Sequence, residues 1–195
     1  FLSNRSSGKM GFAVARAARL RGARVILVSG PSALPAPSGV KFIPVRTAAE
    51  MREAVLGSLA GVSVLVMAAA VSDYRPKVTS PEKIKKSQAE LTLPLELNPD
   101  ILREAGQRKE KRLLIGFAAE TESLLANARK KLAEKNLDLI VANDVSLPGA
   151  GFAADTNIVK LIDRSGKIEE LPLMGKEELA DRVEEGSDGL VVTFE

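Results

Sequence analysis

The 195-residue chain contains no cysteine, histidine or tryptophan. Their absence excludes disulfide bonds, thiolate nucleophiles, Ser-His-Asp triads and Cys/His zinc sites. Any catalysis must therefore use Lys, Asp, Glu, Asn, backbone amides or a hard metal ion held by oxygen ligands.

Long apolar runs and a strong net charge are missing as well. The longest apolar stretches, such as residues 62–71, are far shorter than the ~20 residues of a membrane helix. The N-terminus has no secretory pattern, and it begins inside a motif without an initiator Met, so we expect a fragment or a trimmed domain. A net charge of +3, without an arginine-rich arm, is too small for a nucleic-acid surface. We expect a cytoplasmic protein with neither membrane nor nucleic-acid partners.

Strands and helices alternate along a chain whose size and 45% apolar content suit one domain, residues 1–195. The apolar runs are short and continuous, which is typical of strands covered on both faces. Strands are predicted at residues 24–29, 40–45, 62–67, 113–117 and 137–141, and helices at 9–21, 47–59, 100–108, 121–134 and 176–185. Thr47 is the predicted N-cap of the second helix, with Glu50 at the capping-box position. The pattern predicts an α/β fold: a Rossmann-like open, mostly parallel sheet with helices on both faces.

Other segments look like antiparallel strands. Residues 90–97 alternate strictly, and residues 157–162 and 167–171 form a hairpin pattern across a Ser-Gly turn. We expect both as antiparallel additions at a sheet edge. Residues 190–194 have strand composition without a functional interpretation.

Three predicted strands end in small residues followed by an acid, at residues 68–73, 118–121 and 142–144. In an open parallel sheet, ligands bind beyond the carboxyl ends of the strands. Small side chains there let a ligand approach the backbone. Alanines packed under helices and acids capping helices would explain one such end, but three together favour a ligand site.

Two lysine-bearing segments and one helix start could hold phosphate. The loop at residues 4–11 opens a helix, where amides and the dipole favour an anion, although it lacks the glycine spacing of a P-loop. The cationic segment 74–86 suits a flap over a polyphosphate. On the helix predicted at 121–134, Leu124, Ala128 and Leu132 form the buried stripe. Lys131 and Lys135, on the neighbouring stripe, repel one another at i and i+4 unless an anion lies between them. The alternatives are an ordinary helix cap for the loop at residues 4–11, a solvated basic loop for segment 74–86 and a solvated helix face for the two lysines.

Two other classes of protein remain to be weighed. A nicotinamide-dependent oxidoreductase would want Gly-x-Gly-x-x-Gly after a strand, which is absent, and the Tyr-x-x-x-Lys pair fails because Val78 lies four residues after Tyr74. A noncatalytic nucleotide-sensing module fits the crevice as well as an enzyme does. The residues alone thus predict a phosphate-bearing ligand and leave the reaction open.

Taken in order, six strings resemble bacterial phosphopantothenoylcysteine synthetase, the CTP-dependent phosphopantothenate-cysteine ligase of coenzyme A biosynthesis. They are SNRSSGKMGF at 3–12, AAVSDYR at 69–75, EKIKK at 82–86, NPDIL at 98–102, GFAAET at 116–121, and KNLD with ANDV at 135–138 and 142–145. The resemblance covers roughly residues 1 to 183.

The resemblance implies a reaction in two steps. The carboxylate of 4′-phosphopantothenate attacks the α-phosphate of CTP, pyrophosphate leaves, and the amine of L-cysteine captures the acyl-cytidylate. Mg²⁺ or Mn²⁺ is expected with CTP, although no metal ligand is assigned and the residues alone do not distinguish CTP from ATP. Members of the family dimerise, and many are fused behind a flavin-dependent decarboxylase. We therefore expect a homodimer, and leave such a fusion open for this chain.

The resemblance also assigns residues. It places the essential flap lysine at Lys83 and the essential asparagine at Asn4, suited to holding the acyl carbonyl and steering the amine. The CTP-contacting positions are Asp73, Lys83, Asn98, Pro99, Asp100, Ile101, Phe117, Lys131 and Lys135. Ala69 and Ala70 lie beside the acyl intermediate. Our own inference adds Ser6, Ser7 and Gly8 for the phosphate of the pantothenate substrate.

One departure concerns the start of the chain. The family has a strand and a Gly-Pro-Thr-Arg-like loop ahead of the Asn4 motif, and this sequence begins after them. The first strand is therefore missing, disordered, or replaced by residues 190–194.

Overall fold

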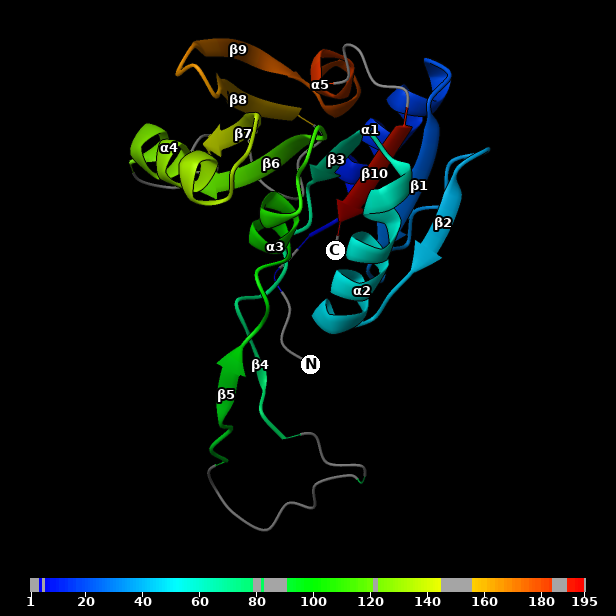
Figure 1. Cartoon of the computed structure of the whole chain (residues 1–195), viewed down its shortest axis with the longest axis vertical. Helices are drawn as coiled ribbons and strands as arrows, with labels where there is room; N and C mark the ends of the chain where they lie inside the picture. The colour runs from blue at the N-terminus through cyan, green and yellow to red at the C-terminus, as the bar shows by residue number, and fades with distance from the viewer. Residues whose placement is uncertain are drawn as a thin grey trace.

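A computed structural model describes residues 4, 6–78, 82, 91–120, 123–144, 156–183 and 189–194. Its centre is an eight-stranded sheet in the order β2-β1-β10-β3-β6-β7-β8-β9 (Figure 1). The strands are β1 Arg24–Ser29, β2 Lys41–Pro44, β3 Val64–Met67, β6 Leu113–Glu120, β7 Leu139–Asp144, β8 Thr156–Asp163, β9 Ile168–Gly175 and β10 Gly189–Phe194. Neighbours from β2 to β7 pair in parallel, whereas β8 and β9 are antiparallel additions. The predicted fold class is confirmed.

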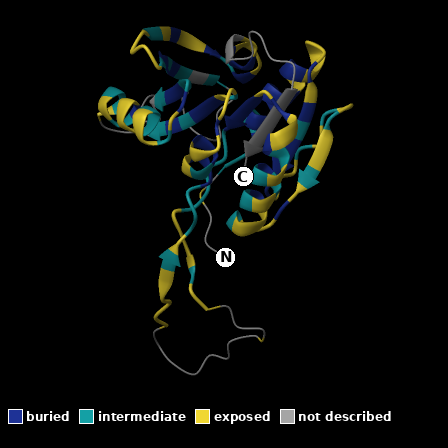
Figure 2. Cartoon of the chain, viewed as in Figure 1, coloured by how far each residue is buried: buried dark blue, intermediate teal, exposed yellow. Residues whose placement is uncertain are grey.

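Helices cover both faces of this sheet. They are α1 Lys9–Leu20, α2 Ala48–Ser58, α3 Ile101–Gln107, α4 Leu124–Glu134 and α5 Lys176–Val183, with a 3₁₀ turn η1 at Leu59–Gly61. Phe12 of α1 and Leu179 of α5 share one core cluster, and Met51 of α2, Ile101 of α3 and Ala128 of α4 share the other. Figure 2 shows the buried strands between these layers. Burial on both faces explains why the strands read as continuous apolar runs.

The helix starts follow the predicted caps. The Thr47 hydroxyl accepts a hydrogen bond from the Glu50 amide at 3.1 Å, as expected for the cap of α2. The Glu50 carboxylate in turn accepts from the Arg46 amide at 2.6 Å, one residue ahead of the usual capping-box partner. Asp100 caps α3 by accepting from the Arg103 amide at 3.1 Å.

The prediction for residues 90–97 is wrong in its location. Only Leu95–Leu97 forms a strand there among the described residues, β5, and it pairs antiparallel with β4, Tyr74–Pro76, in a separate two-stranded ribbon. The ribbon extends away from the body of the molecule (Figure 1). The reason is the position of β3, which lies between β10 and β6 in the sheet. The segment that follows β3 therefore has no free edge strand beside it with which to pair.

The strand expected at residues 190–194 forms β10 inside the sheet. It lies parallel between β1 and β3, with Val191 opposite Ile26 on one side and Leu65 on the other. That it stands in place of the family's first strand stays a prediction. The chain runs outward from β1 to β2 and outward again from β3 through β6 to β7, so its direction reverses between β1 and β3. A ligand crevice is expected beyond the strand ends at such a reversal.

A search of the described residues for membrane-spanning segments finds no helix with the length and apolar character to cross a bilayer.

Candidate functional site

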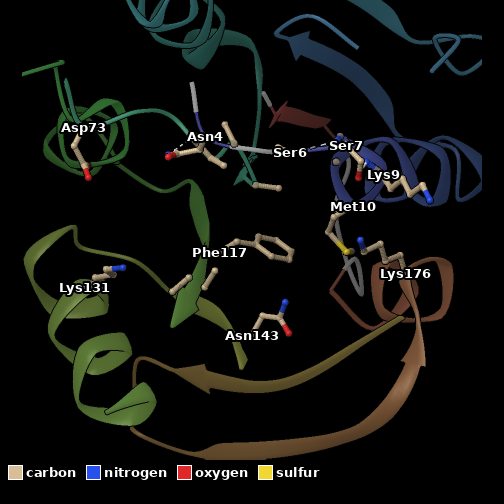
Figure 3. A pocket seen from close by; sticks show the side chains of 17 residues that line it. Asn4, Ser6, Ser7, Lys9, Met10, Asp73, Phe117, Lys131, Asn143 and Lys176 are labelled. Atoms are coloured by element: carbon tan, nitrogen blue, oxygen red, sulfur yellow. Dashed lines mark hydrogen bonds between the residues drawn. The ribbon is translucent and has the colours of Figure 1, made fainter. Parts of the chain in front are cut away.

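A cavity of about 320 Å³ lies at the carboxyl ends of β3, β6 and β7 (Figure 3). It is lined by Asn4, Ser6, Ser7, Gly8, Lys9, Met10, Gly11, Ala68, Ala69, Ala70, Asp73, Phe117, Ala118, Ala119, Lys131, Asn143 and Lys176. All three strand ends with small residues contribute to this lining. The structure therefore brings the three strand ends to one cavity, and its use as a ligand site stays a prediction.

The start of α1 forms one wall of the cavity. Gly8 precedes the helix with φ of 74°, a left-handed conformation that favours glycine, and no side chain caps the helix. The Ser6 hydroxyl accepts from the Gly8 amide at 3.4 Å, and the Ser7 hydroxyl accepts from the Lys9 amide at 3.5 Å. The first turn contains no acidic residue. This wall therefore offers hydroxyls and the positive end of a helix dipole to an anion.

Asn4 joins the N-terminal segment to the end of β3. Its Nδ2 donates to the carbonyl oxygen of Ala70 at 2.9 Å and to that of Val71 at 3.4 Å. These bonds span more than sixty residues of sequence. They place the Asn4 amide beside Ala69 and Ala70, which the resemblance assigns to the same acyl intermediate.

Asp73 reaches the cavity from the turn after β3, and Asn98 fixes that turn. Asn98 Nδ2 donates to the Ser72 carbonyl at 2.8 Å, and the Asn98 amide donates to the Asp73 carbonyl at 2.8 Å. Asn98 and Pro99 line a neighbouring surface groove instead of the cavity. The Ile101 side chain is 2% exposed and packs in the core, so only its backbone can face a ligand. Residues 98–101 thus run beside the cavity and position Asp73.

Lys131 of α4 and Lys135, the residue that follows this helix, face different parts of the surface. Lys131 lines the cavity, whereas Lys135 Nζ lies 3.1 Å from Asp100 Oδ1 and faces a separate depression between α3 and α4. The predicted buried stripe is confirmed, because Ala128 is fully buried and its neighbours Leu124 and Leu132 pack against the same core. Only Lys131 of the pair is placed at the cavity.

Lys83 lies outside the described residues, as does most of the predicted flap; the part described begins with β4. Its convergence with Lys131 around one polyphosphate stays a prediction.

Sequence patterns did not single out Lys176 or Met10, which also line the cavity. Lys176 follows β9 directly and is 8% exposed. Its position depends on the direction of β9. The signal that could have placed Lys176 was the predicted hairpin. Its first strand, β8, runs antiparallel to β7, so its second strand, β9, runs in the direction of β7 again and ends where β7 ends.

The charges around the cavity favour an anionic ligand. Lys9, Lys131 and Lys176 are three cationic residues in the lining, against one carboxylate, Asp73, among the described residues. The Lys9 side chain extends away from the cavity in Figure 3, whereas Lys131 and Lys176 lie on opposite sides of Phe117. An excess of positive charge in a concave site raises the local concentration of anions.

The fold and the cavity define a class: a Rossmann-like α/β protein with a cavity of predominantly cationic lining at the carboxyl ends of its parallel strands. More narrowly, the chain belongs to the family described as DNA/pantothenate metabolism flavoprotein C-terminal domain, whose pattern matches residues 1–186.

Among individual proteins, the chain is similar to the coenzyme A biosynthesis bifunctional protein CoaBC of Bacillus subtilis, with 52% identity over 177 residues, 90% of this chain and 44% of the relative. The Escherichia coli protein of the same description is 49% identical over 181 residues, 91% of this chain and 44% of the relative. The chain therefore spans less than half the length of these relatives.

Solved structures of two other proteins are similar to this chain in fold. A crystal structure of the C-terminal domain of CoaBC has a TM-score of 0.78 at 44% identity, covering 92% of this chain and 81% of that one. A mutant of Cab2, solved in complex with phosphopantothenate-cysteine, has a TM-score of 0.70 at 17% identity, covering 90% of this chain and 76% of that one. The second likeness shows a shared fold.

Proposed function

We propose that the chain joins 4′-phosphopantothenate to L-cysteine at the expense of CTP. The carboxylate oxygen attacks the α-phosphorus of CTP and pyrophosphate leaves. The cysteine nitrogen then attacks the acyl carbon and CMP leaves. One observation carries the proposal: a single cavity is lined by Asp73, Phe117 and Lys131, which the family resemblance assigns to CTP, and by Asn4 and the alanine pair at residues 69–70, which it assigns to the acyl group.

The chemistry fits a site without histidine. Phosphoryl and nucleotidyl transfer depend on placement and charge stabilisation more than on a side-chain base. Lys131 is suited to stabilise charge on the nucleotide phosphates, together with Lys83 from the flap. Asn4, tied to the Ala70 carbonyl, is suited to hold the acyl group for the amine.

The donor set also fits the expected Mg²⁺. This ion is commonly bound through one or two carboxylates plus substrate phosphates. Asp73 supplies one carboxylate, and no cluster of three or more acidic side chains that could hold a metal occurs in the described part of the chain. When bound, Mg²⁺ would offset charge on the triphosphate. Asp73 would then be its protein ligand.

The β4–β5 ribbon supports the proposed homodimer. An isolated two-stranded ribbon is marginally stable in water, yet exposed leucines lie on this one and just ahead of it. Leu95 and Leu97 of β5 are 45% and 66% exposed, and Leu91 and Leu93, which precede β5, are 64% and 50% exposed. A second copy that covers these leucines would stabilise the ribbon.

We also propose that the reaction takes place in the cytoplasm. Fusion of this chain to a flavin-dependent decarboxylase stays a prediction.

A pyrophosphate assay tests the proposal. The chain is incubated with phosphopantothenate, cysteine, Mg²⁺ and each nucleoside triphosphate in turn. We expect pyrophosphate release and ligated product with CTP. Equal release with ATP would reject the CTP assignment. CTP binding without turnover would favour a nucleotide sensor, and saturable NADPH binding without CTP binding would favour an oxidoreductase.

The flap lysine can be tested in the same assay. Lys83→Gln should suppress pyrophosphate release from CTP plus phosphopantothenate, because the cation that offsets phosphate charge is lost. Lys41→Gln removes the same charge from an exposed position of β2, outside the flap and the cavity lining, and serves as control. Full release by Lys83→Gln would remove Lys83 from the mechanism.

A further inference from the structure

The topology of the sheet carries Lys176 to the cavity. Strand β8 is antiparallel to β7, and β9 is antiparallel to β8, so β9 again runs in the direction of β7. Its carboxyl end therefore lies at the edge where β6 and β7 end. Lys176, the next residue and the first of α5, lines the cavity there.

The surroundings fix this lysine in place. Leu179 and Ala180 of α5 are fully buried in the core cluster that contains Phe12 of α1. Beside Lys176, Glu177 accepts a hydrogen bond from Arg16 of α1 at 2.6 Å. The contacts hold α5 against α1. Lys176 and the start of α1, with its hydroxyls and the positive end of its helix dipole, therefore form one end of the cavity.

Burial makes this ammonium effective toward an anion. Lys176 is 8% exposed, and a charge shielded from water interacts with an opposite charge more strongly than a surface charge does. It also occupies the first turn of α5, where the helix dipole disfavours a cation and attracts an anion. The hydroxyls of Ser6 and Ser7 lie in the same lining.

The cavity thus has a cation at each of two ends. Lys131 and Lys176 lie on opposite sides of Phe117 (Figure 3). The acyl-cytidylate of the proposed reaction has two phosphates, one next to the acyl carbonyl and one at the far end of the pantothenate chain. Each phosphate can therefore meet a separate lysine.

We propose that Lys176 binds the 4′-phosphate of phosphopantothenate, together with Ser6, Ser7 and the start of α1. The assignment rests on the proposed function and deepens it. It makes Lys176 the residue by which the site selects the phosphorylated over the unphosphorylated pantothenate. Lys131 serves the nucleotide end.

Steady-state kinetics with two ligands test the proposal. In Lys176→Gln, KM for phosphopantothenate should rise roughly 10- to 100-fold, as expected for loss of a charged hydrogen bond. KM for CTP and the inhibition constant of pantothenate, which lacks the phosphate, should stay unchanged. Lys176→Arg, which keeps the charge, should show a smaller rise. Lys130→Gln, at an α4 lysine whose side chain is 72% exposed, is the matched control.

Other outcomes would overturn the assignment. An unchanged KM for phosphopantothenate would remove Lys176 from the subsite. An equal loss of pantothenate binding would show a structural role, and a rise confined to CTP would move Lys176 to the nucleotide. Calorimetric titration of phosphopantothenate alone separates this inference from the ligase proposal. Weaker binding to Lys176→Gln than to the unaltered chain supports the subsite even without pyrophosphate release, whereas equal binding, or none to either, refutes it.

Discussion

The amino edge of the sheet, where the parallel strands begin, and the carboxyl edge, where they end, use charge in opposite ways. At the amino edge, ahead of β6 and β7, Lys109 Nζ lies 2.5 Å from Asp138 Oδ1 and donates to the Asn136 carbonyl at 3.3 Å. The other oxygen of Asp138 accepts from the Leu114 amide at 2.8 Å. At the carboxyl edge, lysines and helix starts surround a cavity in which Asp73 is the one carboxylate of the described lining.

Arginines continue the pattern at the amino edge. Arg112 Nε donates to the Leu59 carbonyl at 2.7 Å, and Arg164 Nη2 donates to Asn136 Oδ1 at 2.7 Å. Charge at the amino edge is thus paired within the protein, whereas lysines outnumber carboxylates in the described cavity lining at the carboxyl edge. From this comparison we expect similar cations to serve stability at one edge and ligand binding at the other, so substitutions should separate the two properties.

The largest effect is expected at the cavity, from Asn4→Asp. A carboxylate cannot donate to the carbonyl oxygens of Ala70 and Val71, so the acyl group loses its orientation toward the amine. Product formation should fall roughly 10²- to 10³-fold, by analogy with loss of one transition-state donor. The acyl-cytidylate should still form, as measured by its accumulation in a quenched reaction.

The same charge change at Gln107→Glu, an exposed position of α3, should leave activity intact. An unchanged yield of phosphopantothenoylcysteine in Asn4→Asp would refute the division of labour between activation and transfer.

Asp138→Ala tests the amino edge. It leaves the 10% exposed Lys109 side chain without its carboxylate and the Leu114 amide without its acceptor. Breaking a largely buried ion pair should lower the free energy of unfolding by about 3 kcal/mol. Urea denaturation measures this loss, and KM for CTP should not change below the transition. Asp138→Asn, which keeps an acceptor for Leu114, should lose less. A shift in KM at full stability would contradict the separation of the two edges.

Gly106→Ala should perturb the same edge through packing. A Cβ at this position would lie 2.1 Å from the Lys135 carbonyl oxygen, where α3 meets the end of α4. Backbone must move, and we expect a loss of about 1–3 kcal/mol, typical of overpacking. Gly57→Ala in α2 is the control, because nothing lies within 4 Å of its Cβ. Removing that helical glycine should stabilise by about 0.5–1 kcal/mol. Equal thermal unfolding of both variants would refute the close approach.

The sequence predicted most of the elements because their signals are local. Apolar runs marked the strands, and Thr47 with Glu50 marked a helix start that the structure shows. Small residues at three strand ends located the cavity, since parallel strands end at one edge. The rest depends on partners distant in sequence. Lys135 pairs with Asp100 outside the cavity, and the antiparallel strands β8 and β9 bring Lys176 to the cavity.

The smallest effect is expected away from both edges, where Arg52 of α2 pairs with Glu104 of α3. Arg52 Nε and Nη2 each donate to a Glu104 oxygen at 2.7 Å, and this hydrogen bonding lowers the pKa of the Glu104 carboxyl against the opposing effect of burial. A carboxyl with a lowered folded pKa stabilises the fold above its unfolded pKa of about 4.3. The contribution is lost as the pH falls through the folded pKa.

Glu104→Gln should therefore lower Tm slightly at neutral pH and flatten the decline of Tm on acidification. The pair is partly exposed, with side chains 37% and 25% accessible, so the change should be small. Melting curves between pH 7 and pH 3 measure it, with the exposed Glu53→Gln of α2 as control. Ligase activity should be untouched, because neither residue reaches the cavity. Equal acid sensitivity of the Glu104→Gln variant and the unaltered chain would show that the pair contributes nothing to acid stability.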